Sequence, residues 1–133
     1  MHPSPAQKLI DFMKRLLICD LDNTLYDWVG YFVDAFYAMA DELVRITGCD
    51  REALLDDFRE VHRRHHDAEH PFAALETKTL RHRLKGKSVA EMARIIDPAL
   101  HAFNSVRKKR LTLYPTVRST LDQLRDQNAL LVA

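Results

Sequence analysis

The chain has 133 residues, of which 47% are hydrophobic and 29% charged, and 20 Lys and Arg against 19 Asp and Glu leave a formal net charge of +1. This composition is typical of one packed domain and argues against a disordered, collagen-like or disulfide-stapled chain. The balanced charge gives no reason to expect nucleic acid as a partner. No apolar stretch approaches the roughly 20 residues of a membrane span, so we expect a cytoplasmic protein without a membrane partner.

The first strand is predicted over residues 15–19, where a continuous apolar run is too short for a helix. Such a run favours a parallel strand that is covered on both faces. Between residues 29 and 47 the apolar positions recur with helical spacing, and Gly48 is placed to end that helix. Asp50 is the predicted N-cap of a second helix. The apolar stripe of this second helix comprises Leu54, Phe58 and Val61.

Further helices are predicted in the middle of the chain. A helical segment opens at Pro71, and residues 88–91 form a capping box that starts the next one. Asp97 then resembles an N-cap followed by Pro98 at the first helical position, which predicts the start of another helix. Helices with short connections bury their apolar stripes only against one another, so residues 29–108 are expected to form a small helical bundle.

The last part of the chain returns to a strand. Residues 111–115 are predicted to be extended, 116–127 to form an amphipathic helix and 129–133 to form a second parallel strand. The order of strand, helical insert, helix and strand predicts the α/β class. The beginning of a parallel sheet is then expected in residues 1–28 and 109–133.

Two acidic residues, Asp20 and Asp22, come directly after the first strand, where open α/β sheets place their ligands. A carboxylate is a competent nucleophile toward phosphorus when a divalent cation neutralises the charge that builds there. A second carboxyl can protonate the leaving oxygen and later activate water. Asp20, Asp22 and Thr24 project the same way only if the segment stays extended. The plainer alternative is an acidic turn that only caps the strand.

Residues 18–25, Ile-Cys-Asp-Leu-Asp-Asn-Thr-Leu, resemble the first motif, Asp-x-Asp-x-Thr, of the haloacid dehalogenase (HAD) superfamily. The helical insert that follows resembles the class I cap of that superfamily. Residues 113–117 are similar to the segment by which such caps return to the core, with one departure at Thr116, where the family usually has glycine. The resemblance implies that the two terminal segments form a partial Rossmann-like core and that residues 29–108 form its cap.

By this resemblance, Asp20 is the nucleophile, forms an aspartyl-phosphate and binds Mg²⁺. Asp22 is the general acid and base and offers its backbone carbonyl to the metal, while Thr24 holds the turn and positions Asp22. Asn23 is expected to belong to the turn, and Tyr26, which directly follows the motif, is a candidate substrate contact, with aromatic packing under the cap as an equal alternative. The dehalogenase branch does not keep an aspartate at the position of Asp22. A magnesium-dependent phosphatase acting on a small phosphorylated metabolite is therefore favoured over a dehalogenase of the same fold.

A histidine-rich segment supplies a second hypothesis, in which the bundle is a non-catalytic interaction or metal-binding module. His62, His66 and His70 recur at four-residue spacing, and His65 lies beside them. They share one helix face only if the helix continues to His70. A solvated helix end is the plainer interpretation, as it is for the basic run at residues 107–110.

The superfamily completes its site with a Ser or Thr after the second core strand, a Lys and a later acidic pair. The chain stops at Ala133, where the first of these groups is due. We therefore expect the N-terminal part of a longer hydrolase, with a weak magnesium site and little activity on its own. Two strands by themselves also leave apolar faces bare. No motif specifies the substrate or the oligomeric state.

Overall fold

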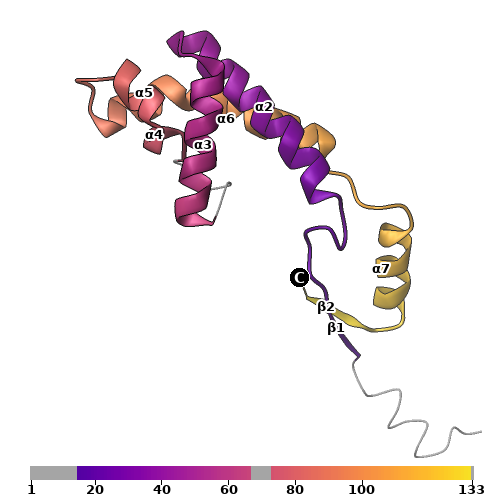
Figure 1. The fold of residues 1–133 in the computed structure, drawn as a ribbon. Helices are drawn as coiled ribbons and strands as arrows, with labels where there is room; N and C mark the ends of the chain where they lie inside the picture. The colour runs from indigo at the N-terminus through magenta and orange to yellow at the C-terminus, as the bar shows by residue number, and fades with distance from the viewer. Residues whose placement is uncertain (1–14, 67–72, 133) are drawn as a thin grey trace, which may run out of the picture. The chain divides into compact units, whose positions relative to one another are not determined.

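A computed structural model describes residues 15–66 and 73–132 (Figure 1). The chain divides into two compact units, one formed by Met1–Val29 with Leu111–Ala133 and the other by Gly30–Arg110. Whether these units correspond to a partial core and a cap stays a prediction. The elements in chain order are β1 (Leu16–Ile18), α2 (Trp28–Thr47), α3 (Arg51–His65), α4 (Ala73–Glu76), α5 (Lys78–Arg83), α6 (Val89–Arg110), α7 (Val117–Asp126) and β2 (Leu130–Val132).

The predicted fold class is wrong. Helices make up 69% of the described residues, and the sheet found among them has only two strands of three residues each. Two such short strands do not form a layer that helices cover on both faces. The described chain is therefore a small, mostly helical protein and not an α/β protein with a HAD-type Rossmann-like core.

The two strands themselves were predicted correctly, as was their parallel direction. Leu16 pairs with Leu130, and Ile18 with Val132. Side chains two residues apart in a strand share a face, so these four residues lie on one face of the sheet, where all four are exposed. The opposite face carries the half-buried pair Leu17 and Leu131. Among the described residues nothing covers the first face, so cover on both faces is not found, and the bare apolar face expected of two strands by themselves is present.

The helical unit holds the main hydrophobic core. The predicted stripe of α3 is confirmed, because its three members Leu54, Phe58 and Val61 are all buried. The same cluster takes buried residues from the other helices of the unit, among them Met39, Leu43, Leu75, Leu80, Ile96 and Ala99. Burying one large aliphatic side chain contributes about 1.5–3 kcal/mol, so this cluster is the main source of stability in the unit.

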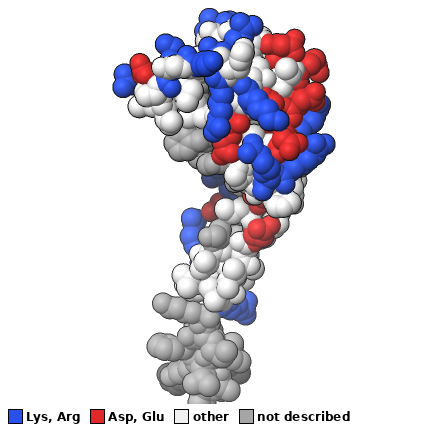
Figure 2. Space-filling model, turned by 60° about the vertical axis from the view of Figure 1, so that its left-hand side comes forward, with Lys and Arg blue, Asp and Glu red and all other residues white. Residues whose placement is uncertain are grey.

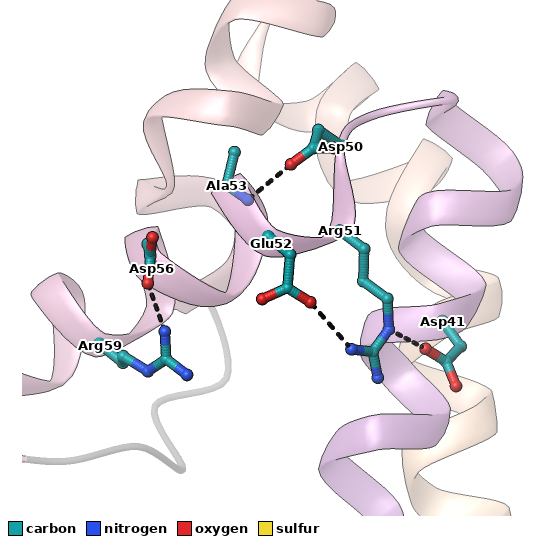
Figure 3. A network of polar contacts seen from close by, with 7 residues as sticks. All are labelled: Asp41, Asp50, Arg51, Glu52, Ala53, Asp56 and Arg59. Atoms are coloured by element: carbon teal, nitrogen blue, oxygen red, sulfur yellow. Dashed lines mark hydrogen bonds and ion pairs between the residues drawn. The ribbon is translucent and has the colours of Figure 1, made fainter.

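The turn between α2 and α3 follows the predicted local chemistry. Gly48 ends α2 with a φ of +62°, a left-handed conformation that glycine adopts without strain. Asp50 is the N-cap of α3, and its Oδ1 accepts a hydrogen bond of 2.8 Å from the Ala53 N–H (Figure 3). Arg51 reaches back to α2, with its Nε 2.9 Å from Oδ1 of Asp41. Both partners are exposed, so this ion pair contributes little beyond orienting the two helices.

The third predicted helical segment is split in two. Pro71 and Phe72 lie outside the described residues, and the segment after them forms α4 and α5 with Thr77 between them. Thr77 is buried, and its hydroxyl donates to the Ala74 carbonyl at 2.7 Å. A threonine hydroxyl that binds a carbonyl three residues back competes with the helical backbone, which accounts for the break.

The predicted capping box is confirmed, but the predicted helix start at Asp97-Pro98 is wrong. The Ser88 N–H donates to Glu91 Oε2 at 2.7 Å, and the Glu91 N–H donates to Ser88 Oγ at 3.3 Å. From there α6 runs unbroken through Pro98. Proline inside a helix costs about 3 kcal/mol through its missing N–H and its ring. The buried neighbours Ile96 and Ala99 offset that cost, so packing overrides the local signal.

The helix α7 begins at Val117, one residue after its predicted start. Thr116 is its N-cap, with a φ of +72° and no capping hydrogen bond from its side chain. Threonine is strained in this left-handed region, whereas glycine is not. The backbone conformation at position 116 therefore favours glycine over threonine.

Candidate active site

The acidic segment leaves β1 and turns at once. The N–H groups of Thr24 and Leu25 both donate to the Leu21 carbonyl, at 3.2 and 2.9 Å. Asn23 has a φ of +55°, a left-handed conformation that asparagine tolerates better than most residues. The segment is thus a tight turn and not an extended strand, so simple alternation does not decide where its side chains point.

Each of the two aspartates accepts a hydrogen bond from a hydroxyl four residues further along. The Thr24 hydroxyl donates to Asp20 Oδ2 at 3.1 Å, and the Tyr26 hydroxyl donates to Asp22 Oδ1 at 2.6 Å. The resemblance implies that Thr24 positions Asp22. In the structure Thr24 contacts Asp20, and the hydroxyl that contacts Asp22 belongs to Tyr26. The sequence predicts Tyr26 as a substrate contact and contains no signal for this hydrogen bond.

One hydrogen bond from a backbone N–H to a side chain and two backbone bridges hold the turn. Asn23 Oδ1 accepts a hydrogen bond of 3.1 Å from the N–H of Trp28, the first residue of α2. The backbone of Tyr26 forms bridges with Asp22 on one side and with Leu113 on the other. The turn is therefore held both by its neighbours in sequence and by the distant residue Leu113. The roles predicted for Asn23, Thr24 and Tyr26 in the turn and in substrate contact stay predictions.

The arrangement leaves one oxygen of each carboxylate without a hydrogen bond from the rest of the described chain. These atoms are Asp20 Oδ1 and Asp22 Oδ2, and both residues are exposed. Within residues 15–66 and 73–132, no ion pair joins either carboxylate to a basic side chain. Chemically, Asp20 Oδ1 is available to attack an electrophile, and Asp22 Oδ2 is available to exchange a proton.

The oxygens of this turn can be compared with the ligands that Mg²⁺ requires. Carboxylate and carbonyl oxygens are the ligands that Mg²⁺ prefers, and Mg²⁺ keeps several waters when proteins bind it. Asp20 offers a carboxylate oxygen and Asp22 offers its backbone carbonyl. No group of three metal-ligating side chains occurs among residues 15–66 and 73–132. The donor set has the right chemistry for Mg²⁺ but too few members to hold it firmly.

The histidine-rich segment does not form the continuous helix face that a metal site on it requires. Helix α3 ends at His65, and His66 follows in a left-handed conformation with a φ of +55°. His65 Nε2 lies 2.7 Å from Glu76 Oε2 of α4. His62 lines a small cavity of about 200 Å³ between α2 and α3. His70 lies outside the described residues.

The basic run at residues 107–110 is the exposed C-terminal end of α6, which agrees with its interpretation as a solvated helix end. Arg110 Nε lies 3.0 Å from Oδ2 of Asp34 in α2. Figure 2 shows Lys and Arg interspersed with Asp and Glu on the face of the helical unit that it displays. No helix in the described part of the chain is long and apolar enough to cross a membrane.

No model of a known protein family and no curated protein matches this chain. The functional assignment therefore depends on the motif at residues 18–25 and on the geometry of its turn.

Proposed function

We propose that this chain contributes the nucleophile and the acid/base group of a phosphatase of the HAD type, which acts on a small phosphorylated metabolite. The observation that carries the proposal is the turn after β1, in which Asp20 and Asp22 are each hydrogen-bonded through one carboxylate oxygen and keep the other available. The proposal uses the motif and this local geometry and needs no Rossmann-like core among the described residues. Cys19 and Cys49 are both free, which suits the reducing cytoplasm.

The reaction proceeds in two displacements at phosphorus. In the first, Asp20 Oδ1 attacks the phosphorus, the bond to the leaving oxygen breaks, and Asp22 gives its proton to that oxygen. In the second, water attacks the aspartyl-phosphate, its proton passes to Asp22, and the bond from phosphorus to Asp20 breaks to release phosphate. The proton of Asp22 is restored, so the cycle balances. Halide would need no proton donor, so Asp22 supports a phosphate ester over a haloacid.

Magnesium is the cofactor that the proposal includes. Asp20 and the Asp22 carbonyl would hold it, and when bound it would neutralise negative charge on the phosphoryl oxygens. Because the described residues provide only these donors, we expect weak binding and a requirement for added Mg²⁺.

The test is phosphate release from a panel of sugar, alkyl and nucleoside phosphates, with and without Mg²⁺. It is run on this chain and on the longest reading frame that contains it. Asp20→Asn should abolish the activity. Asp126→Asn is the matched control, because it makes the same charge change at an exposed site of α7 and should leave the activity unchanged. Equal activity of Asp20→Asn and the parent protein would refute the assignment of the nucleophile.

A further inference from the structure

Tyr26 is held against Asp22 by features of the fold and not by chance side-chain placement. Its backbone forms bridges with Asp22 on one side and with Leu113 on the other. The carbonyl of the neighbouring Leu25 accepts a hydrogen bond of 2.9 Å from the Tyr114 N–H. The ring is half-buried, although Asp22 itself is exposed. A tyrosine side chain has only two rotatable angles before its hydroxyl, so fixing the backbone and the ring also fixes the position of that hydroxyl.

The contact between the two side chains is short. The Tyr26 hydroxyl donates to Asp22 Oδ1 at 2.6 Å, which is at the short end of the range for O–H···O hydrogen bonds. The corresponding contact from Thr24 to Asp20 is longer, at 3.1 Å, and comes from a side chain that is exposed. The acid/base carboxylate is therefore the more firmly held of the two.

We infer that Tyr26 is the positioning residue of the proposed acid/base group, the role that the resemblance assigns to Thr24. By occupying Oδ1, the Tyr26 hydroxyl leaves Oδ2 as the oxygen that carries the exchangeable proton of Asp22. It also selects the rotamer that presents this oxygen. Tyr26 keeps its own proton throughout both displacements. The inference rests on the proposed function, and it adds a residue through which Asp22 acts.

A positioning role predicts a dependence on the leaving group. An alkyl phosphate needs a proton on its leaving oxygen, whereas p-nitrophenyl phosphate leaves readily as the phenolate. Tyr26→Phe keeps the ring and removes only the hydroxyl. We expect it to lower kcat on an alkyl phosphate by about 10- to 100-fold, less than the roughly 10²- to 10⁴-fold that general acid catalysis supplies. KM should stay within about twofold, because a positioning role acts on the proton transfer and not on substrate binding; a larger rise in KM would instead mark the Tyr26 hydroxyl as a substrate contact.

With p-nitrophenyl phosphate the first displacement should continue at nearly the parent rate in Tyr26→Phe. The second displacement should slow, because Asp22 must then take a proton from water. The expected signature is a burst of p-nitrophenol followed by a slower steady rate. A role of Tyr26 in stability alone would slow both substrates equally and give no burst. Tyr37→Phe is the matched control, since the exposed Tyr37 in α2 also loses only a hydroxyl.

The experiment includes a readout that does not need activity. The chemical shift of the Asp22 carboxyl carbon, measured by NMR, should change in Tyr26→Phe and stay the same in Tyr37→Phe. An unchanged shift in Tyr26→Phe overturns the inference even if the protein is an active phosphatase, as does equal slowing of both substrates. If the protein encoded by the longest reading frame shows the changed shift but releases no phosphate, the proposed function and the catalytic role of Tyr26 are refuted, while the hydrogen bond itself is established.

Discussion

Replacing Thr116 with glycine should stabilise the unit that contains α7. Thr116 has a φ of +72°, and its side chain makes no capping hydrogen bond. A β-branched residue in that region carries strain of about 1–3 kcal/mol. Glycine removes the strain but gains freedom in the unfolded chain, which costs about 0.5–1 kcal/mol. We therefore expect Thr116→Gly to raise the free energy of unfolding by about 0.5–2 kcal/mol.

Two control variants separate this effect from a general response to glycine. Thr120 lies inside α7, where glycine should lower the free energy of unfolding by several tenths of a kcal/mol. Thr116→Ala keeps a Cβ at the same φ and should retain most of the strain. The backbone carbonyl of residue 116 accepts a hydrogen bond of 2.9 Å from the Thr120 N–H. Every variant at position 116 keeps this carbonyl.

The assay is equilibrium unfolding in urea, followed by the fluorescence of Trp28, the single tryptophan of the chain, which belongs to the same unit as α7. The predicted order of stability is Thr116→Gly above Thr116→Ala, with Thr120→Gly below the parent. A loss of stability in Thr116→Gly as large as in Thr120→Gly would show that the left-handed conformation at Thr116 carries no strain.

Two further predictions concern the helical unit. Leu54→Ala removes a fully buried side chain from the core and should lower the free energy of unfolding by about 2–5 kcal/mol. Val89 is 67% exposed, so Val89→Ala should change the free energy of unfolding by less than about 0.5 kcal/mol. Similar effects of the two substitutions in urea unfolding would contradict the assigned core. Hydrogen bonds from the Ser88 hydroxyl and then the Ser88 N–H lower the pKa of Glu91 below its ordinary value of 4.5. Because the pKa of Glu91 is lowered in the folded state, the contribution of its carboxylate to the free energy of unfolding is present above pH 4.5 and is lost as the pH falls through the folded pKa. Glu91→Gln should therefore flatten that part of the profile of stability against pH. An unchanged profile would argue against the capping box.

Features set by local chemistry could be predicted from the sequence. Asp50 and the pair Ser88 and Glu91 were predicted as caps, because a carboxylate or hydroxyl satisfies the free N–H groups of the first turn wherever a helix begins. The two strands were predicted from their apolar runs. The predictions failed where packing decides, as at Pro98, which signals a helix start but lies inside α6 between buried residues. The same reason applies to the fold class, since local patterns do not say how many strands assemble.

The candidate site also has features that the sequence predicts and features that it does not predict. The identities of Asp20 and Asp22 and their position after a strand could be predicted, because the motif is contiguous in sequence. The partner of Asp22 could not, because it depends on the left-handed conformation of Asn23 and on the bridge between Tyr26 and Leu113, which is distant in sequence. Geometry of this kind becomes visible only when the turn is folded.

Identifying the residue that becomes phosphorylated tests directly whether Asp20 is the nucleophile. The protein is mixed with Mg²⁺ and a reactive phosphate ester such as p-nitrophenyl phosphate, quenched in acid during turnover and digested, and the peptides are mapped by mass spectrometry. We predict one phosphoryl group on the peptide that contains Asp20, located at Asp20 and absent in Asp20→Asn. Phosphate release together with a phosphoryl group on another residue, or with full activity in Asp20→Asn, would contradict the central claim.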